Sequence, residues 1–314
     1  MLNERRTIYV VAYLIVYAIA AQILISGFNE SPKDILTVFA CVGIGFSLAA
    51  WYLTKNIRNR TRDKISFPKE TWFIIFLIAW IVLYITYGSG FIDRLLPASI
   101  LKNQRVYSFI TLARKLLVFV FVPFFLYKTA GFSSKDFGLR LPVKKIFTVK
   151  NIVIFLVLSI LITAFQYYLS NGGKNFRKEH FTLLQLITGF PLLFVWLFVE
   201  AGLVEEFFFR AVLQARLSLL LKSRTAGIVV SGLIFGLAHA PGLYLRGAGS
   251  EGIEEQLPFI FFAAYTIVYM SIAGIFLGIL YIRTKNLWLV IALHAMVDLI
   301  PNFSDFIHTW YLPF

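Results

Sequence analysis

Three short stretches in the last third of the chain place acids and bases at spacings that suit hydrolytic chemistry. Glu205 and Glu206 are adjacent, and Arg210 follows Glu206 by four residues. Residues four apart share a helix face, so Glu206 and Arg210 are predicted to pair as a structural clamp. Glu205 is rotated by about 100° from Glu206 and is therefore expected to act elsewhere, as a base or a ligand.

Two histidines follow on later apolar segments. His239 is followed at once by an Ala-Pro-Gly sequence, which is predicted to end its helix. His294 and Asp298 are four residues apart, so the aspartate can accept a hydrogen bond from one imidazole nitrogen. A lone histidine is often only a satisfied core residue, and a buried His–Asp pair can simply pin two helices together. The convergence of these groups with Glu205 on neighbouring apolar segments favours a catalytic set.

This set holds the parts of peptide hydrolysis by an activated water. A carboxylate in apolar surroundings becomes a better general base, and an imidazole beside it can help to position the water. A second imidazole can donate to a developing oxyanion, and no serine or cysteine nucleophile is needed. The same groups could bind zinc, with Glu205, His239 and His294 as the candidate ligands, although the H-E-x-x-H signature is absent.

The elements that carry these residues are strongly apolar. Of the 314 residues 59% are hydrophobic and 15% charged, and the mean hydropathy is +0.78, which is typical of a polytopic membrane protein. A spanning helix needs roughly 20 mainly apolar residues. The sequence predicts an all-α membrane protein of eight or nine transmembrane helices with the active site between the C-terminal helices. The candidate spans are 7–26, 35–53, 71–88, 108–127, 151–169, 181–206, 225–240, 258–282 and 286–301.

The net charge of +14 comes from basic residues in short segments between the apolar runs. That pattern is typical of topology signals and of contacts with anionic lipid headgroups, not of nucleic-acid binding. More than twice as many Lys and Arg residues fall on one side of the membrane as on the other when the N-terminus is cytoplasmic, which predicts that orientation. The first apolar run is interpreted as an uncleaved helix and not as a signal peptide.

The chain divides by composition into three parts. Residues 1–180 are predicted to form N-terminal transmembrane helices and a cytoplasmic linker, residues 181–302 the core with the candidate site, and residues 303–314 a C-terminal tail. The glycine-rich and acidic segment 242–258 is interpreted as a solvated loop, with a flexible lid as the alternative.

Taken together, the motifs resemble those of the CPBP family of intramembrane proteases (CAAX protease and bacteriocin-processing, Abi-like). The family motifs E-E-x-x-x-R, F-x-x-x-H and H-x-x-x-N/D read here as residues 205–210, 235–239 and 294–298, and the resemblance covers roughly 183 to 300. It implies that Glu205 is the general base, that His239 helps to position the water, and that His294 and Asp298 stabilise the oxyanion. Glu206 and Arg210 would support them.

Position 298 departs from the asparagine that many members carry. An ionised Asp298 cannot donate to an oxyanion, so it is protonated, orients His294, or supports a metal ligand. No cofactor is favoured, and zinc is kept as the alternative. The implied substrate is a membrane-associated peptide or protein, with membrane lipid as the other partner, and the compact chain is typical of a bacterial plasma-membrane protein.

Two other functions fit the composition. A non-proteolytic scaffold or bacteriocin-immunity protein could keep the same fold, but it would have no need to retain Glu205, His239 and His294. A transporter could use membrane Glu and His residues as a proton relay. It would be favoured by discontinuous helices in paired positions of two halves, and the sequence shows none.

Overall fold

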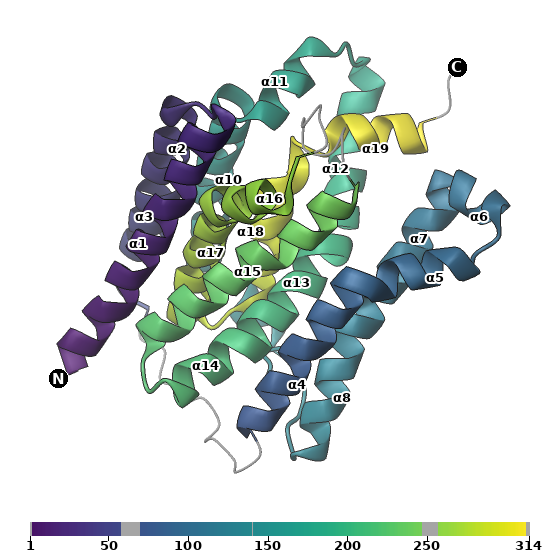
Figure 1. Ribbon diagram of the computed structural model, residues 1–314. Coiled ribbons are helices and arrows are strands. Elements are labelled where there is room, and N and C mark those ends of the chain that lie inside the picture. The colour runs from purple at the N-terminus through teal and green to yellow at the C-terminus, as the bar shows by residue number, and fades with distance from the viewer. Residues whose placement is uncertain (1, 58–69, 140, 247–256, 312–314) are drawn as a thin grey trace. The chain divides into compact units, whose positions relative to one another are not determined.

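The computed structural model describes residues 2–57, 70–139, 141–246 and 257–311, and helices make up most of that part of the chain (Figure 1). Within these residues eight helices are long and apolar enough to cross a membrane. They are Thr7–Phe28, Pro32–Thr54, Glu70–Gly88, Gln104–Thr129, Val149–Leu169, Leu183–Leu220, Arg224–Leu245 and Phe259–Thr284. Leu287–Leu299 and Phe303–Trp310, bent by 82°, would together make a ninth. The prediction of an all-α polytopic membrane protein with eight or nine spans is confirmed.

The chain forms two compact units, each described by itself. The first contains residues 1–86, 136–138 and 209–285. Its helices are α1 (Leu2–Phe28), α2 (Pro32–Val38), η1 (Phe39–Phe46), α3 (Ser47–Thr54), α4 (Glu70–Leu83), α14 (Ala215–Leu220), α15 (Arg224–Arg246), α16 (Phe259–Tyr265), η7 (Thr266–Met270) and α17 (Ser271–Thr284), where η marks a π-helical stretch. Two further π-helical stretches, η2 (Tyr84–Gly88) and η5 (Phe207–Gln214), pass from one unit into the other.

Glycines let the two central helices of the first unit approach closely. α17 packs along α15 (Figure 1), and a Cβ added to Gly274 would lie 3.1 Å from the Cα of Gly232. A Cβ at Gly236 would lie 2.6 Å from the carbonyl oxygen of Thr266. Small residues at such contacts are typical of helix packing in membranes.

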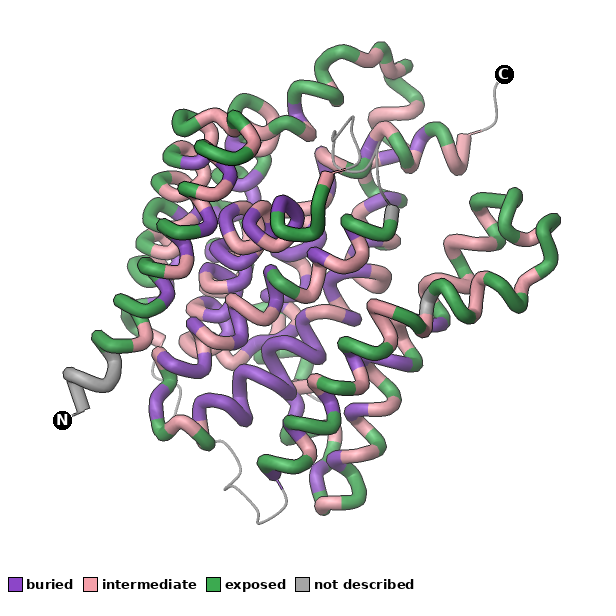
Figure 2. Tube along the Cα trace, in the orientation of Figure 1, coloured by how far each residue is buried: buried purple, intermediate pink, exposed green. Residues whose placement is uncertain are grey.

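The outer helices of this unit expose apolar side chains. On α1, Ile8, Val11, Ile15 and Ile19 are all exposed, while Leu24 is fully buried (Figure 2). An exposed apolar face on a long helix is the surface that lipid tails would cover.

The second unit contains residues 87–135, 139–208 and 286–314. Its helices are α5 (Ser89–Leu95), α6 (Ala98–Lys102), α7 (Gln104–Lys115), η3 (Leu116–Phe121), α8 (Val122–Thr129), α9 (Val143–Ile146), α10 (Val149–Leu169), α11 (Asn171–Lys178), α12 (Leu183–Leu197), η4 (Phe198–Leu203), α13 (Val204–Glu206), α18 (Leu287–Leu299) and α19 (Phe303–Trp310).

The core of the second unit joins α12, α18 and α19. Its buried members are Leu193, Leu197, Ala295, Leu299, Phe303 and Ile307. The segment predicted as a tail therefore begins with a helix whose Phe303 and Ile307 lie in the core. This packing seats α18, and with it His294, firmly in the unit.

Two helix ends differ from the predictions. The sixth apolar helix does not stop at 206 but continues to Leu220. The helix of His239 does not end at the Pro-Gly pair, because α15 runs through Pro241 to Arg246. Ala240 and Leu243, on either side of that proline, are both fully buried, and we attribute the continuation to their packing, which outweighs the hydrogen bond that proline removes. Most of the predicted loop 242–258 lies outside the described residues, and its first five residues are helical.

Candidate active site

Glu205 and Glu206 lie on a three-residue α-helical turn, α13, that is flanked by π-helical stretches on both sides. In π-helical turns the hydrogen bonds run from i to i+5, and such wide turns are frequent at functional sites. Gly202 lets the preceding stretch approach α18, because a Cβ there would lie 2.7 Å from the carbonyl oxygen of Ile291. The turn that carries the two glutamates is thereby seated directly on the helix of His294.

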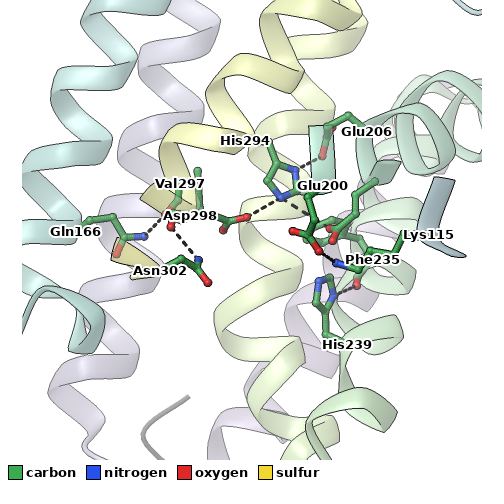
Figure 3. A network of polar contacts seen from close by, with 11 residues as sticks. Lys115, Gln166, Glu200, Glu206, Phe235, His239, His294, Val297, Asp298 and Asn302 are labelled. Atoms are coloured by element: carbon green, nitrogen blue, oxygen red, sulfur yellow. Dashed lines mark hydrogen bonds and ion pairs between the residues drawn. The ribbon is translucent and has the colours of Figure 1, made fainter. Parts of the chain in front are cut away.

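Carboxylates surround the imidazole of His294 on both of its nitrogens (Figure 3). Nδ1 lies 2.7 Å from Oε1 of Glu206. Nε2 lies 3.3 Å from Oδ2 of Asp298 and 3.8 Å from Oε2 of Glu205. The adjacent glutamates thus approach opposite nitrogens of one ring, as expected from the rotation between successive helix positions.

The burial of these groups is graded. The side chain of Glu206 is fully buried and that of His294 is 6% exposed, whereas Glu205 is 16% and Asp298 30% exposed. Glu206 is therefore the inner anchor of the imidazole. Glu205 and Asp298 are the more exposed of the three carboxylates around the ring.

The arrangement requires one proton more than a neutral imidazole supplies. A neutral ring carries one N–H and one lone pair, and an ionised carboxylate only accepts hydrogen bonds. With carboxyl groups facing both nitrogens, the further proton sits either on the ring or on one of the carboxyl groups. The site thus stores a proton, as general acid–base chemistry requires.

Polar side chains hold both ends of α18. At its start Asn286 caps the helix, and its Oδ1 accepts from the backbone N–H of Leu289. At its end Gln166 donates to the carbonyl oxygen of Val297 over 3.0 Å, and Asn302 donates to that of Asp298 over 2.8 Å (Figure 3). These donors satisfy carbonyls that a helix end leaves open, which limits movement of the residues beside His294.

The first unit holds the other two predicted site residues on either side of Phe235. The guanidinium of Arg210, fully buried, lies 4.9 Å from the ring centroid of Phe235, which is a cation–π contact. The rings of Phe209 and His239 pack on the same aromatic at 5.1 Å and 4.9 Å. One phenylalanine therefore connects the arginine of the first motif to the histidine of the second.

A backbone contact fixes the tautomer of His239. Its Nδ1 lies 2.8 Å from the carbonyl oxygen of Phe235, and a carbonyl can only accept. Nδ1 therefore carries the hydrogen in the neutral ring, and Nε2 presents a lone pair. A lone pair at Nε2 can accept a hydrogen bond from a water molecule.

The structure brings four of the six predicted residues together in the second unit: Glu205, Glu206, His294 and Asp298. Arg210 and His239 belong to the first unit, so the Glu206–Arg210 clamp and the pairing of His239 with Glu205 stay predictions. Two roles were missed from the sequence. The contact of Glu206 with His294 joins residues 88 apart, and no spacing rule points to it. Phe235 stood in the second motif, but nothing in its spacing showed that its carbonyl orients His239.

Comparison with known proteins gives one match, to part of the chain. Residues 187–300 match the family model described as Rce1-like, Type II CAAX prenyl endopeptidase Rce1-like. No curated protein and no solved structure matches the chain. This integral membrane protein is therefore similar to the Rce1-like endopeptidases over those residues, and the predicted resemblance to the CPBP intramembrane proteases is confirmed. All three motifs lie within the matched residues.

Proposed function

We propose that this protein is an intramembrane endopeptidase that hydrolyses a membrane-associated peptide or protein with a water activated by Glu205. The observation that carries this proposal is the position of Glu205, which lies on the more exposed side of the His294 imidazole, between carboxylates that face both ring nitrogens. The Rce1-like match supports the reaction class. A scaffold or immunity protein has no need of such a proton-holding cluster.

In the proposed reaction Glu205 takes a proton from water as the water oxygen bonds to the scissile carbonyl carbon. The Nε2 lone pair of His239 accepts the water's second hydrogen, which aligns the oxygen for attack. The Nε2–H of the protonated His294, which Asp298 orients, is shared with the carbonyl oxygen as that oxygen gains negative charge. Glu205 then gives its proton to the leaving nitrogen as the C–N bond breaks, so the products are a carboxylic acid and an amine.

The remaining carboxyl groups orient the ring. Glu206 fixes it from the buried side through Nδ1, in the way that an outer partner fixes a catalytic histidine. Asp298, 3.3 Å from Nε2, is proposed to orient His294 and not to donate to the oxyanion itself. Orienting His294 is one of the three roles for Asp298 that the sequence left open.

We further propose that no metal takes part. Within the described residues no three His, Cys, Asp or Glu side chains are grouped as metal ligands would be. Zinc held by Glu205, His239 and His294 remains the alternative. Cleavage that persists in a zinc chelator supports hydrolysis without metal, and cleavage that is lost on chelation and restored by added zinc supports the alternative.

The reaction is tested by profiling peptide termini in membranes from cells that express the wild type or Glu205→Ala at matched levels. Glu179→Ala is the matched control, because that carboxylate pairs with His308 at an exposed site. New termini in the wild type and the control, absent with Glu205→Ala, support the proposal and identify the substrate. If the wild type and Glu205→Ala give the same termini, and Glu205→Ala fully rescues a phenotype of gene deletion, the protease proposal is wrong. The scaffold function would then take its place.

We also propose a bacterial plasma membrane as the location, with the N-terminus cytoplasmic. The support is the excess of basic residues in the segments assigned to the cytoplasm. An N-terminal green fluorescent protein fusion should fluoresce in the cell. An N-terminal alkaline phosphatase fusion with high activity would place that end outside and reverse the orientation.

A further inference from the structure

A second ion pair lies in the same unit, and the proposed reaction does not use it. The ammonium group of Lys115, the last residue of α7, contacts Oε1 of Glu200 on η4 (Figure 3). The two side chains are 29% and 18% exposed. Ionisable side chains inside membrane spans are costly and rarely kept without a role.

Glu200 precedes Glu205 by five residues, and η4 occupies most of that interval. In an α-helix residues five apart would be rotated by about 140° from each other. In a π-helical turn, where i contacts i+5, they move toward a common face. The widened turn therefore brings Glu200 toward the helix face that carries Glu205.

The elements around α13 show how the pair acts on it. η3, which begins directly after Lys115, packs against α13, and η4 packs against α18. The Lys115–Glu200 contact thus ties α7 to the stretch from which α13 emerges. A shift of that stretch would move Glu205 relative to His294.

The charges on these elements are unbalanced without the lysine. The titratable and charged groups on η4, α13, α18 and the end of α7 are Glu200, Glu205, Glu206, His294, Asp298, Arg114 and Lys115, and Arg114 is paired with Asp93 of α5. Four of them are carboxylates. If Lys115 were neutral, Glu200 would add an uncompensated negative charge one helical turn from Glu205, and like charges disfavour ionisation.

We propose that Lys115 is a positioning residue for the hydrolysis: through its ion pair with Glu200 it holds Glu205 beside His294 and compensates the charge of Glu200. This inference rests on the proposed role of Glu205 as the base. It predicts that the positive charge, more than the lysine chain itself, is what the site requires.

The neighbouring residue supplies a matched control. Arg114 also forms an ion pair within this unit, with its Nη1 2.7 Å from Oδ1 of Asp93. That pair joins α7 to α5, and α5 carries none of the site residues. Arg114→Met therefore removes a cation from the same helix end and leaves both side chains of the Lys115–Glu200 pair in place.

The test uses the full chain in lipid vesicles and a fluorogenic form of the peptide whose terminus disappears with Glu205→Ala. The constants kcat and KM are measured from pH 5 to 9. The proteins compared are the wild type, Lys115→Met, Lys115→Arg, Arg114→Met and the double variant Lys115→Met/Glu200→Gln. Thermal unfolding of each variant is followed in parallel.

Lys115→Met is expected to lower kcat about 10- to 100-fold, as loss of an outer partner of a catalytic group does. It should also move the acidic limb of the pH–rate profile upward by about 1.5 pH units, from an uncompensated charge roughly 8 Å away at an effective dielectric constant of about 20. Lys115→Arg and the double variant should return toward the wild-type profile. Arg114→Met should alter unfolding but not the profile.

The two possible failures are distinguishable. If Glu205→Ala cleaves the peptide as the wild type does, the proposed function itself is wrong. If Glu205→Ala is inactive while Lys115→Met keeps the wild-type kcat and pH profile, only the positioning role is wrong. If Lys115→Met does not fold, the other two variants decide. A wild-type pH–rate profile for the double variant supports the role of Lys115 in compensating the charge of Glu200. A Lys115→Arg variant that folds but is inactive overturns that role.

Discussion

Replacing Gly202 by alanine should impair catalysis more than folding. The added Cβ would lie 2.7 Å from the carbonyl oxygen of Ile291, which is backbone of α18 and cannot swing aside as a side chain can. Ordinary contact begins at 3.4 Å, so η4 and α18 must separate by about 0.7 Å in an interior packed to native density. Glu205 and His294 follow these two elements and would separate with them.

The magnitude follows from the tolerance of catalytic geometry. Reacting groups must be held within about 0.5 Å, and a misplacement of about 1 Å can cost 100-fold. We therefore expect kcat to fall about 10- to 100-fold. Overpacking costs about 1–3 kcal/mol, and the better helix propensity of alanine returns up to about 1 kcal/mol, so the net loss of stability is about 0–3 kcal/mol.

The assay compares Gly202→Ala with Gly90→Ala in the same unit. Gly90 lies on the helix α5, and a Cβ there meets nothing within 4 Å. Both variants are purified in detergent, returned to lipid vesicles, and measured for kcat on the identified peptide and for thermal unfolding. A Gly202→Ala variant whose kcat stays within about twofold of Gly90→Ala would show that the approach of η4 to α18 does not set the position of Glu205.

Three further outcomes are expected. Glu206→Gln should keep the fold, because the amide oxygen still accepts from Nδ1 of His294, but it should lose about 10- to 100-fold in kcat because the negative charge is gone. Glu206→Ala should in addition unfold more easily, and equal unfolding curves for the two variants would contradict this. Arg216→Ala should lower the free energy of unfolding in detergent by about 3–5 kcal/mol. The buried Glu70, whose carboxylate lies 3.1 Å from the guanidinium, would then have lost that partner. Replacing both residues by leucine should cost far less. Burial, with a nearby aspartate charge, raises the pKa of Glu30 above its usual 4.5, so the folded protein holds that proton more tightly and loses stability as the pH rises through the window that begins near 4.5. Glu30→Gln should therefore melt higher than the wild type at pH 7 and alike at pH 4, and a lower melting temperature at pH 7 would refute it.

Hydropathy and motif spacing were sufficient to predict the fold class and the candidate residues. Apolar runs long enough to span a bilayer are visible in the residue types alone, since the membrane allows few alternatives to a helix. The i,i+4 spacing of His294 and Asp298 also predicted their contact, which the structure shows at 3.3 Å. Local rules work here because both residues lie on one regular helix.

The predictions lost accuracy where tertiary packing decides the outcome. Nothing in the sequence distinguishes the π-helical η4 and η5 from α-helix, because their residues are equally apolar. Pro241 is a helix breaker by local rules, yet buried neighbours carry α15 through it. The contact of Glu206 with His294 joins distant segments, and its existence depends on how η4 is seated on α18.

The π-helical stretch η4 has a consequence for changes in chain length. A π-helical turn holds about one residue more than an α-helical turn, because its hydrogen bonds run from i to i+5. A one-residue deletion in η4 can therefore be absorbed by a return to α-helix, which keeps the face of α12 that packs on α18 and α19 in phase with Glu205. The same deletion within the α-helical α12 has no such reserve and would rotate the residues before it by about 100°. Relatives that keep the chemistry should therefore tolerate the loss of one residue in η4 more readily than a loss within α12.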